Sequence, residues 1–227
     1  MLVFLDLETT GLESNDKVVS IAVIVVDEDN VIKSYDIVNE GKKIPSKASS
    51  IHHLTNEDIK GKVKLIESET YKLLGAHNQA GVTLICHNIN YDLKMLRSVG
   101  FEWYGEMIDT LRVSKHLMND CDEFSLQFLR YELKLYKEEE DGIQAHHAMS
   151  DALVTKQLYD YLLSLQNHEE LQRLSFLNVL MQKFPFGKYV DRYIEEISML
   201  DRAYLEWMLN NILDLDEDLR YSIEYNL

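Results

Sequence analysis

Short apolar runs separated by turn signals fill the first forty residues, and this pattern restricts the possible folds of the chain more than any other feature. Leu2–Leu7 and the β-branched run Val18–Val26 have the length and composition of strands. Asp27–Asn30 is typical of a hairpin turn, and Val31–Val38 is the expected returning strand. Three consecutive strands joined by short links predict an antiparallel meander.

Strand and helix signals alternate after the meander. Val82–Cys86 is a further strand candidate, and Tyr91–Val99 has apolar residues at helical spacing. Thr55 followed by Asp58 resembles a capping box and predicts a helix start. Asp151–Leu165 predicts a long amphipathic helix. This order of elements predicts an α/β fold in which helices pack on a mixed sheet.

The size of the chain fits one ordinary domain with a small appendage. It has 227 residues, of which 46% are hydrophobic, so a core can be buried and wholesale disorder is excluded. The motif Phe184–Gly187, which contains one of the 2 prolines, interrupts a helical stretch. We expect a main domain over residues 1–165, a helical linker over 166–182 and a small C-terminal module over 183–227.

Several features predict a cytoplasmic protein. The chain has 2 cysteines: Cys86 lies in an apolar run and Cys121 in an acidic loop, so both are expected to be reduced thiols. No apolar stretch reaches the roughly 18 residues of a membrane span. The N-terminal segment lacks a basic leader and a small-residue cleavage site, so we expect neither a signal peptide nor a membrane partner.

The net charge of −16, from 23 Lys and Arg against 39 Asp and Glu, is unusual for a protein that binds a polyanion. Bound divalent cations are one way to bring phosphate close, because they dominate the local charge of a site. Local basic groups, such as Lys42 with Lys43 or Lys94 with Arg97, are either a phosphate track or ordinary solubilising residues. Any binding to DNA should be weak and sensitive to salt.

Asp6 and Glu8 lie two positions apart on the first predicted strand, so their carboxylates project from one face. Adjacent acids on an apolar strand are costly unless a positive charge lies between them, and a divalent metal supplies one. The alternative is that the strand ends at Leu5 and both acids are solvated.

Two further segments carry candidate catalytic groups. Asp92 follows the strand Val82–Cys86 at a helix start, near the strand end where sites form in such sheets. Asp151 opens the last long helix, and His146 lies in the loop before it. Histidine is well suited to accept a proton near neutral pH. The structural alternatives are a helix cap at each acid and a loop histidine without a chemical role.

Four carboxylates without a thiolate favour hard cations, Mg²⁺ or Mn²⁺, over Zn²⁺. Two such ions about 4 Å apart can activate a water molecule and stabilise a leaving oxygen in phosphoryl displacement. The constellation resembles the DEDDh branch of the DnaQ-like 3′–5′ exonucleases. The matching segments, in order along the chain, are Asp6–Gly11, Ile51–Thr55, His87–Asp92 and His146–Ala152.

The resemblance implies an RNase H-like fold, with a mixed β-sheet flanked by helices, and release of 5′-mononucleotides from DNA 3′ ends with two divalent cations, Mg²⁺ or Mn²⁺. The implied catalytic residues are Asp6, Glu8, Asp92, His146 and Asp151. The four acids are the implied metal ligands, and His146, rather than His147, is the implied general base. The implied substrate-binding residues are Glu8, Thr9, Leu12, His52 and Asn88. His53 stands where the family has glycine.

The tail of the chain resembles the C-terminal module of the exodeoxyribonuclease X group in this family. The matching segments are Phe186–Tyr189, Tyr204–Trp207 and Leu219–Ser222. Val190–Arg192 differs, because the group tends to have a basic residue and glycine there. We expect Tyr204, Trp207 and Met208 in the core of this module.

Two other functions fit the same residues. A ribonuclease of the same superfamily would trim RNA or short oligonucleotides, since the catalytic motifs do not distinguish the sugars. A non-catalytic nucleic-acid-binding scaffold on a nuclease fold is disfavoured, because all five catalytic positions are intact.

Overall fold

The computed structural model describes residues 1–28, 30–119, 121, 123–138 and 146–227. Within these ranges the chain forms two compact units, Met1–Ser175 and Phe176–Leu227. The first unit takes in helix α7 (His168–Leu174), which falls inside the segment expected to be a linker. The predicted helical stretch ends there, because the backbone N–H groups of Val179 and Met181 bind side chains of the second unit's last helix instead of continuing a helical ladder.

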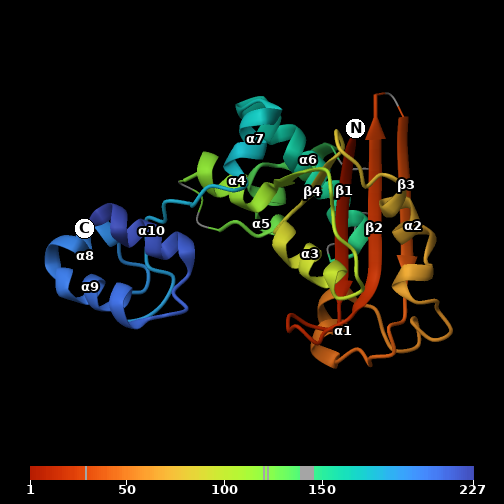
Figure 1. The fold of residues 1–227 in the computed structure, drawn as a ribbon, viewed down its shortest axis with the longest axis horizontal. Helices are drawn as coiled ribbons and strands as arrows, with labels where there is room; N and C mark the ends of the chain where they lie inside the picture. Colours follow the sequence, from red (N-terminus) through yellow and green to blue (C-terminus); the bar gives the residue numbers. More distant parts are fainter. Residues whose placement is uncertain (29, 120, 122, 139–145) are drawn as a thin grey trace. The chain divides into compact units, whose positions relative to one another are not determined.

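The first unit is built on a mixed five-stranded sheet of order β3-β2-β1-β4-β5 within the described residues (Figure 1). The strands are β1 (Leu2–Thr9), β2 (Val18–Asp27), β3 (Asn30–Ile37), β4 (Thr83–Cys86) and β5 (Glu106–Asp109). The first three pair antiparallel, which confirms the predicted meander, and β4 and β5 add parallel to β1. The carboxyl ends of β1, β4 and β5 therefore meet at one edge of the sheet.

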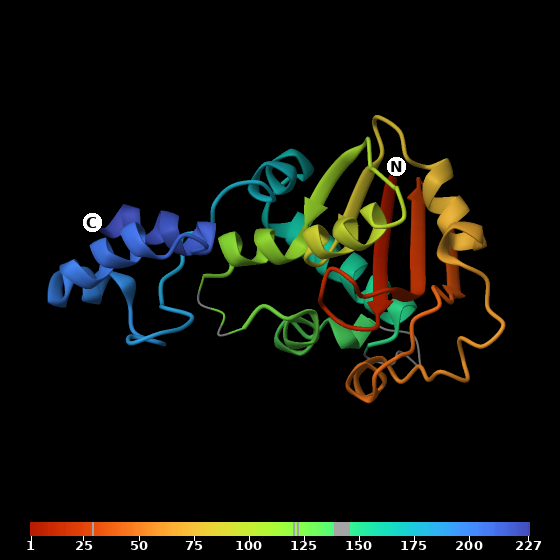
Figure 2. The same ribbon diagram turned by 60° about the horizontal axis from the view of Figure 1, so that its bottom comes forward.

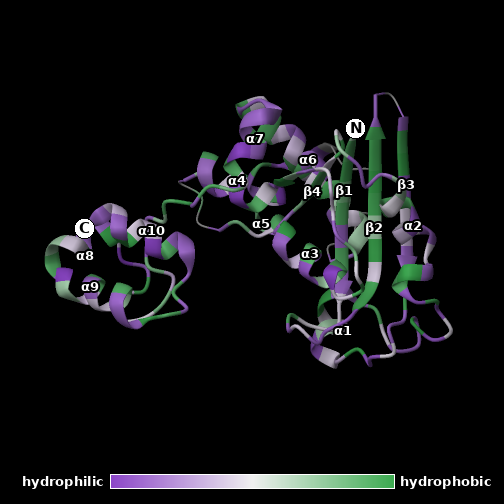
Figure 3. Ribbon diagram, in the orientation of Figure 1, coloured by the Kyte–Doolittle hydropathy of each residue, from purple (hydrophilic) through white to green (hydrophobic). Residues whose placement is uncertain are grey.

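Each face of the sheet has its own apolar core. Odd-numbered β1 residues such as Val3 and Leu5 pack with α2 (Glu69–Ala76) and α3 (Ile89–Arg97). On the other face, Phe4 packs with α5 (Leu126–Glu132), α6 (Ala148–Leu165) and α7. The two views place the sheet between α3 and α6 (Figure 2). Strand β2 is hydrophobic over most of its length (Figure 3), as expected for a strand buried on both sides.

The structure corrects two predicted helix starts. Asp58 closes a turn by accepting hydrogen bonds from the N–H and the hydroxyl of Thr55, at 2.7 Å each, and no helix follows. The helix in this region is α1 (Ser46–His52), which precedes the predicted position. Helix α6 begins at Ala148, so Asp151 lies within its first turn and does not open it.

The remaining elements complete both units. They are η1 (Leu65–Glu67), α4 (Thr110–Leu117) and η2 (Leu135–Glu138) in the first unit, and α8 (Ile194–Leu200), α9 (Arg202–Asn211) and α10 (Glu217–Asn226) in the second. Met208 is fully buried in the core of the second unit, as predicted, and Tyr204 packs against that core. Trp207 is 52% exposed, so its predicted place in the core is wrong. It stacks on Tyr204 from outside, at 6.0 Å between ring centroids. Across the described ranges, we find no helix that combines the length and the apolar character of a membrane span.

Candidate active site

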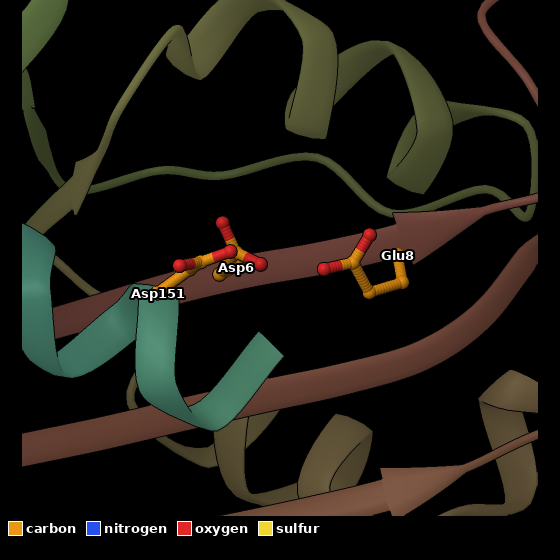
Figure 4. Close-up of side chains that lie close together, drawn as sticks. All are labelled: Asp6, Glu8 and Asp151. Atoms are coloured by element: carbon orange, nitrogen blue, oxygen red, sulfur yellow. The ribbon is translucent and has the colours of Figure 1, made fainter. Parts of the chain in front are cut away.

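Strand β1 presents Asp6 and Glu8 on the same face as the buried Phe4, which is the face that packs against α6. Both acids belong to the strand and are partly buried, so the alternative in which the strand ends at Leu5 is wrong. A register irregularity follows at Glu8 and Thr9, where β1 leaves its regular pairing with β2. The two carboxylates thus lie close to the point where the regular pairing of β1 with β2 is interrupted, and Figure 4 shows both side chains projecting from β1.

Helix α6 brings Asp151 to these two acids. Ala148 and Ala152 are fully buried. Their small side chains let α6 lie close to β1. One carboxylate oxygen from each of Asp6, Glu8 and Asp151 lies within 4.8 Å of the others. Figure 4 shows the three side chains converging from β1 and α6. Three acids distant in sequence therefore share one site.

Burial and mutual repulsion make it costly for the three clustered carboxylates to be charged at the same time. Burial raises the pKa of Asp6 well above its ordinary value, and the neighbouring carboxylates raise it further. Burial, then the charge of Asp151, raises the pKa of Glu8 to about 8. Burial also raises the pKa of Asp151 to about 7. Three acids that resist ionising together fit a divalent cation, which would favour their charged forms.

Asp92 lies beside this cluster and outside the tight group of three. It sits in the first turn of α3, on the opposite side of the sheet from α6, and is 5% exposed. Burial, followed by the charge of Asp109, raises its pKa well above the ordinary value. The charge of Asp92 in turn raises the pKa of Asp6, so the two carboxyl groups interact. Its role as a metal ligand remains a prediction.

A cavity of about 310 Å³ opens over the three acids. Its lining residues are Asp6, Leu7, Glu8, His87, Ser125, Leu126, Gln127, His146 and Asp151. His146 is exposed and has a φ of 56°, in the left-handed region. Its backbone N–H group lowers the pKa of Asp151 by hydrogen bonding to the charged carboxylate. The predicted general base is therefore at the same cavity as the acids.

The loop after β1 is held by a set of internal hydrogen bonds. The hydroxyls of Thr9 and Tyr91 both donate to the carbonyl of Gly11, each at 2.8 Å. The carboxylate of Asp16 accepts from the Thr10 hydroxyl and from Lys42 Nζ, each at 2.6 Å. Its interaction with Lys42, then with Thr10, lowers the pKa of Asp16 to about 2. This fixed loop presents the next side chain, Leu12, at 78% exposure.

The remaining predicted substrate-binding residues differ in their exposure. His52 is 4% exposed; its Nδ1 accepts from the Leu54 N–H, and its Nε2 has no hydrogen-bond partner among the described residues. His53, which replaces the family's glycine, adopts the left-handed conformation with a φ of 63° at the end of α1. A residue with a Cβ is strained in this conformation, which glycine adopts without that strain. Asn88 is exposed, also left-handed, and does not cap α3 with its side chain.

Two residues that line the cavity, His87 and Gln127, were not predicted from the sequence to have a functional role of their own. Burial lowers the pKa of His87 to about 4, so its ring is neutral at pH 7; Nε2 donates to the carbonyl of Phe124 at 2.9 Å. Gln127 donates to Asp151 at 2.6 Å. His87 stands inside a recognised motif, but the partner of Gln127 is set by the packing of α5 on α6, which no local pattern indicates.

A family model described as an exonuclease matches residues 3–159, and the chain belongs to this exonuclease family. It is accordingly a nuclease enzyme of the DnaQ-like type. A second model, described as exodeoxyribonuclease X-like C-terminal, matches residues 184–212.

Relatives extend the similarity over the whole chain. Exodeoxyribonuclease 10 of Escherichia coli (strain K12) is 24% identical over 100% of this chain and 99% of its own length. A PolC-type DNA polymerase III of Caldanaerobacter subterraneus subsp. tengcongensis is 27% identical over 80% of this chain and 13% of the polymerase. A structure of exonuclease X in complex with 5′ overhanging duplex DNA matches with a TM-score of 0.63 and 22% identity, over 77% of this chain and 99% of that one. Escherichia coli exonuclease I with a dA16 oligonucleotide matches with a TM-score of 0.57 and 18% identity, over 76% and 42%. The predicted RNase H-like fold is confirmed.

Proposed function

We propose that the chain is a metal-dependent 3′–5′ exodeoxyribonuclease that releases 5′-mononucleotides from DNA 3′ ends. The observation that carries this proposal is the convergence of Asp6, Glu8 and Asp151 within 4.8 Å, at a cavity that His146 also lines. The names of the relatives, an exodeoxyribonuclease and nucleases bound to DNA, support DNA as the substrate.

The three clustered carboxylates fit hard divalent cations, Mg²⁺ or Mn²⁺, because they offer only oxygen ligands and resist ionising without a positive charge nearby. Asp6, Glu8 and Asp151 would hold such ions, with Asp92 as the fourth proposed ligand. When bound, a pair of these cations supplies water activation and stabilises the departing 3′ oxygen.

The chain's own residues then divide the remaining tasks. His146 accepts the proton of the attacking water, since it lines the cavity beside the acids and histidine is the side chain that most often serves as a general base. We propose that Glu8, Thr9 and His52 contact the terminal nucleotide. Asn88, exposed at the start of α3, completes the substrate-binding set. The rigid loop after β1 positions Leu12 against the terminal base.

The charge of the chain shapes how DNA binds. Two of the basic residues considered for a phosphate track are engaged in ion pairs, Lys42 with Asp16 and Arg97 with Glu102. These pairs reduce the positive charge that Lys42 and Arg97 can offer to phosphates, so we expect weak DNA binding that depends on the metal. Cys86 and Cys121 are not joined in a disulfide, which fits the cytoplasmic setting that we propose.

A direct test is to digest single-stranded DNA, duplex DNA and RNA side by side, each labelled at either end, with Mg²⁺ and with EDTA. We expect mononucleotides from the DNA 3′ end only, and no product with EDTA. Faster release from RNA would replace the proposal with the ribonuclease alternative. No release from any substrate with Mg²⁺ or Mn²⁺ would favour the non-catalytic scaffold.

Leu12 provides a test of how the 3′ end is held. An apolar side chain with 78% exposure can wedge against the terminal base pair, and unstacking such a step costs a few kcal/mol. We therefore expect Leu12→Ala to slow duplex degradation on the order of tenfold and to affect single strands less. Initial rates on matched substrates measure this ratio, with the exposed Leu213→Ala as the control. An unchanged ratio of duplex to single-strand rates would contradict the wedge.

A further inference from the structure

Gln127 makes a short hydrogen bond to one of the clustered acids. Its side-chain Nε2 donates to Asp151 Oδ1 at 2.6 Å, across the contact between α5 and α6. Gln127 is half-buried and lines the same cavity as Asp6 and Glu8. One oxygen of the Asp151 carboxylate is therefore engaged by an uncharged donor, which reduces the rotational freedom of that side chain.

Arg130 determines which end of the Gln127 amide faces Asp151. Its Nη1 donates to Gln127 Oε1 at 3.1 Å from one turn further along α5. Because a guanidinium group has only donors, the amide must present its oxygen to Arg130 and its NH₂ group to Asp151. Arg130 is itself 6% exposed, and its positive charge partly offsets the rise that burial causes in the pKa of Asp151. Hydrogen bonds therefore link the buried guanidinium group of Arg130 to Gln127, and Gln127 to Asp151. We call this chain of hydrogen bonds the relay.

We propose that Gln127, oriented by Arg130, is a positioning residue that holds the Asp151 carboxylate in place to bind the divalent cation. This inference rests on the proposed metal-dependent function. Residues that orient a metal ligand typically alter metal affinity by about 10–100-fold when they are removed. The backbone N–H of His146 binds the same carboxylate, so Asp151 is held by groups from two separate segments.

A purely structural role for Gln127 makes a different prediction. If Gln127 only packed α5 against α6, an apolar side chain of equal length could replace it without weakening metal binding, because the contact between these helices is largely apolar. Leu129 and Leu158 are both fully buried in that core. Gln127→Met keeps the length and the packing of the side chain and removes its donor. Folding should then be retained while metal binding is weakened.

The experiment measures Mn²⁺ binding to the full chain by titration calorimetry, without DNA, and circular dichroism confirms that each variant is folded. We expect Gln127→Met to bind Mn²⁺ about 10–100-fold more weakly than the parent. Arg130→Met should weaken binding less, and Arg130→Lys, which keeps a donor, should weaken it least. The double variant Gln127→Met with Arg130→Met should lose less affinity than the two single losses combined, because Arg130 acts on Asp151 partly through Gln127 and partly through its own charge.

Leu129→Val is the matched control, since it loosens the buried side of α5 without touching the hydrogen bond. Its Mn²⁺ affinity should equal that of the parent. Parental affinity in Gln127→Met would overturn the inference while leaving the proposed function intact. Fully additive losses in the double variant would overturn the relay, and equal losses in Leu129→Val would indicate a structural role. A parent that binds no Mn²⁺ would overturn the metal-dependent function together with this inference.

Discussion

Replacing Asp6 with Asn, or Asp151 with Asn, should reduce nucleotide release by about 10³-fold or more, because each substitution removes a charged ligand that the cation needs. Both side chains belong to the group of three whose oxygens lie within 4.8 Å of one another. The measurement is the rate of mononucleotide release from labelled DNA at saturating Mg²⁺. Substantial activity in either variant would show that the cluster does not hold the catalytic metal.

Asp6→Asn should also stabilise the metal-free protein. This result would distinguish the loss of a metal ligand from the loss of the fold. Burial and neighbouring carboxylates raise the pKa of Asp6, and raise that of Glu8 to about 8. A folded-state pKa above the unfolded one means that the folded state binds more protons, so stability falls as pH rises between the two values. With EDTA, the parent should lose stability from about pH 4.5 to about pH 8, the ordinary and the raised values for Glu8. Asp6→Asn should lose less, because one repelling charge is gone.

Thermal unfolding between these pH values, with EDTA and with Mg²⁺, measures this difference. Mg²⁺ should raise the melting temperature of the parent at pH 8 and that of Asp6→Asn much less, since a ligand stabilises only the state that binds it. Asp160→Asn is the control: it lies on α6 with Asp151, and its exposed carboxylate pairs with Lys156. That variant should match the parent in rate and in its response to Mg²⁺. A lower melting temperature of Asp6→Asn in EDTA would contradict the proposed repulsion.

The sheet could be predicted from the sequence because its strands are continuous apolar runs. Strand β2 is buried along nearly its whole length, and its run of β-branched residues favours a strand over a helix. The failed prediction at Thr55 has a physical cause: its hydrogen bonds to Asp58 close a turn as well as they would cap a helix. A capping pattern alone does not decide between the two.

The clustered acids were predictable because a strand period fixes Asp6 beside Glu8, and the family motif adds Asp151. The environment that makes Gln127 and Asp109 important was not predictable. Asp109 is 1% exposed and accepts the Asn88 N–H at 3.0 Å, which ties the start of α3 to the end of β5. Such bonds arise only when parallel strands end at the same edge of a sheet, and neither partner shows it locally.

The second large effect is expected for His146. Its replacement with Ala should lower the rate of nucleotide release by roughly 10²–10⁴-fold, the usual contribution of a general base. Mn²⁺ binding should be retained, because the imidazole is not among the three clustered ligands. This combination of slow turnover with intact metal affinity distinguishes a proton acceptor from a metal ligand, and single-turnover rates together with calorimetry measure both.

The neighbouring histidine supplies the matched control. The ring of His147 packs tilted against that of Tyr35 with 4.6 Å between ring centroids, so His147→Phe keeps an aromatic ring in that position and removes the nitrogens that could accept or donate a proton. If His146 is the base, His147→Phe should remain close to the parental rate while His146→Ala does not. The opposite result would assign proton transfer to His147. Equal and small effects of both changes would mean that water deprotonation does not depend on either ring, and that the charged cluster alone lowers the barrier.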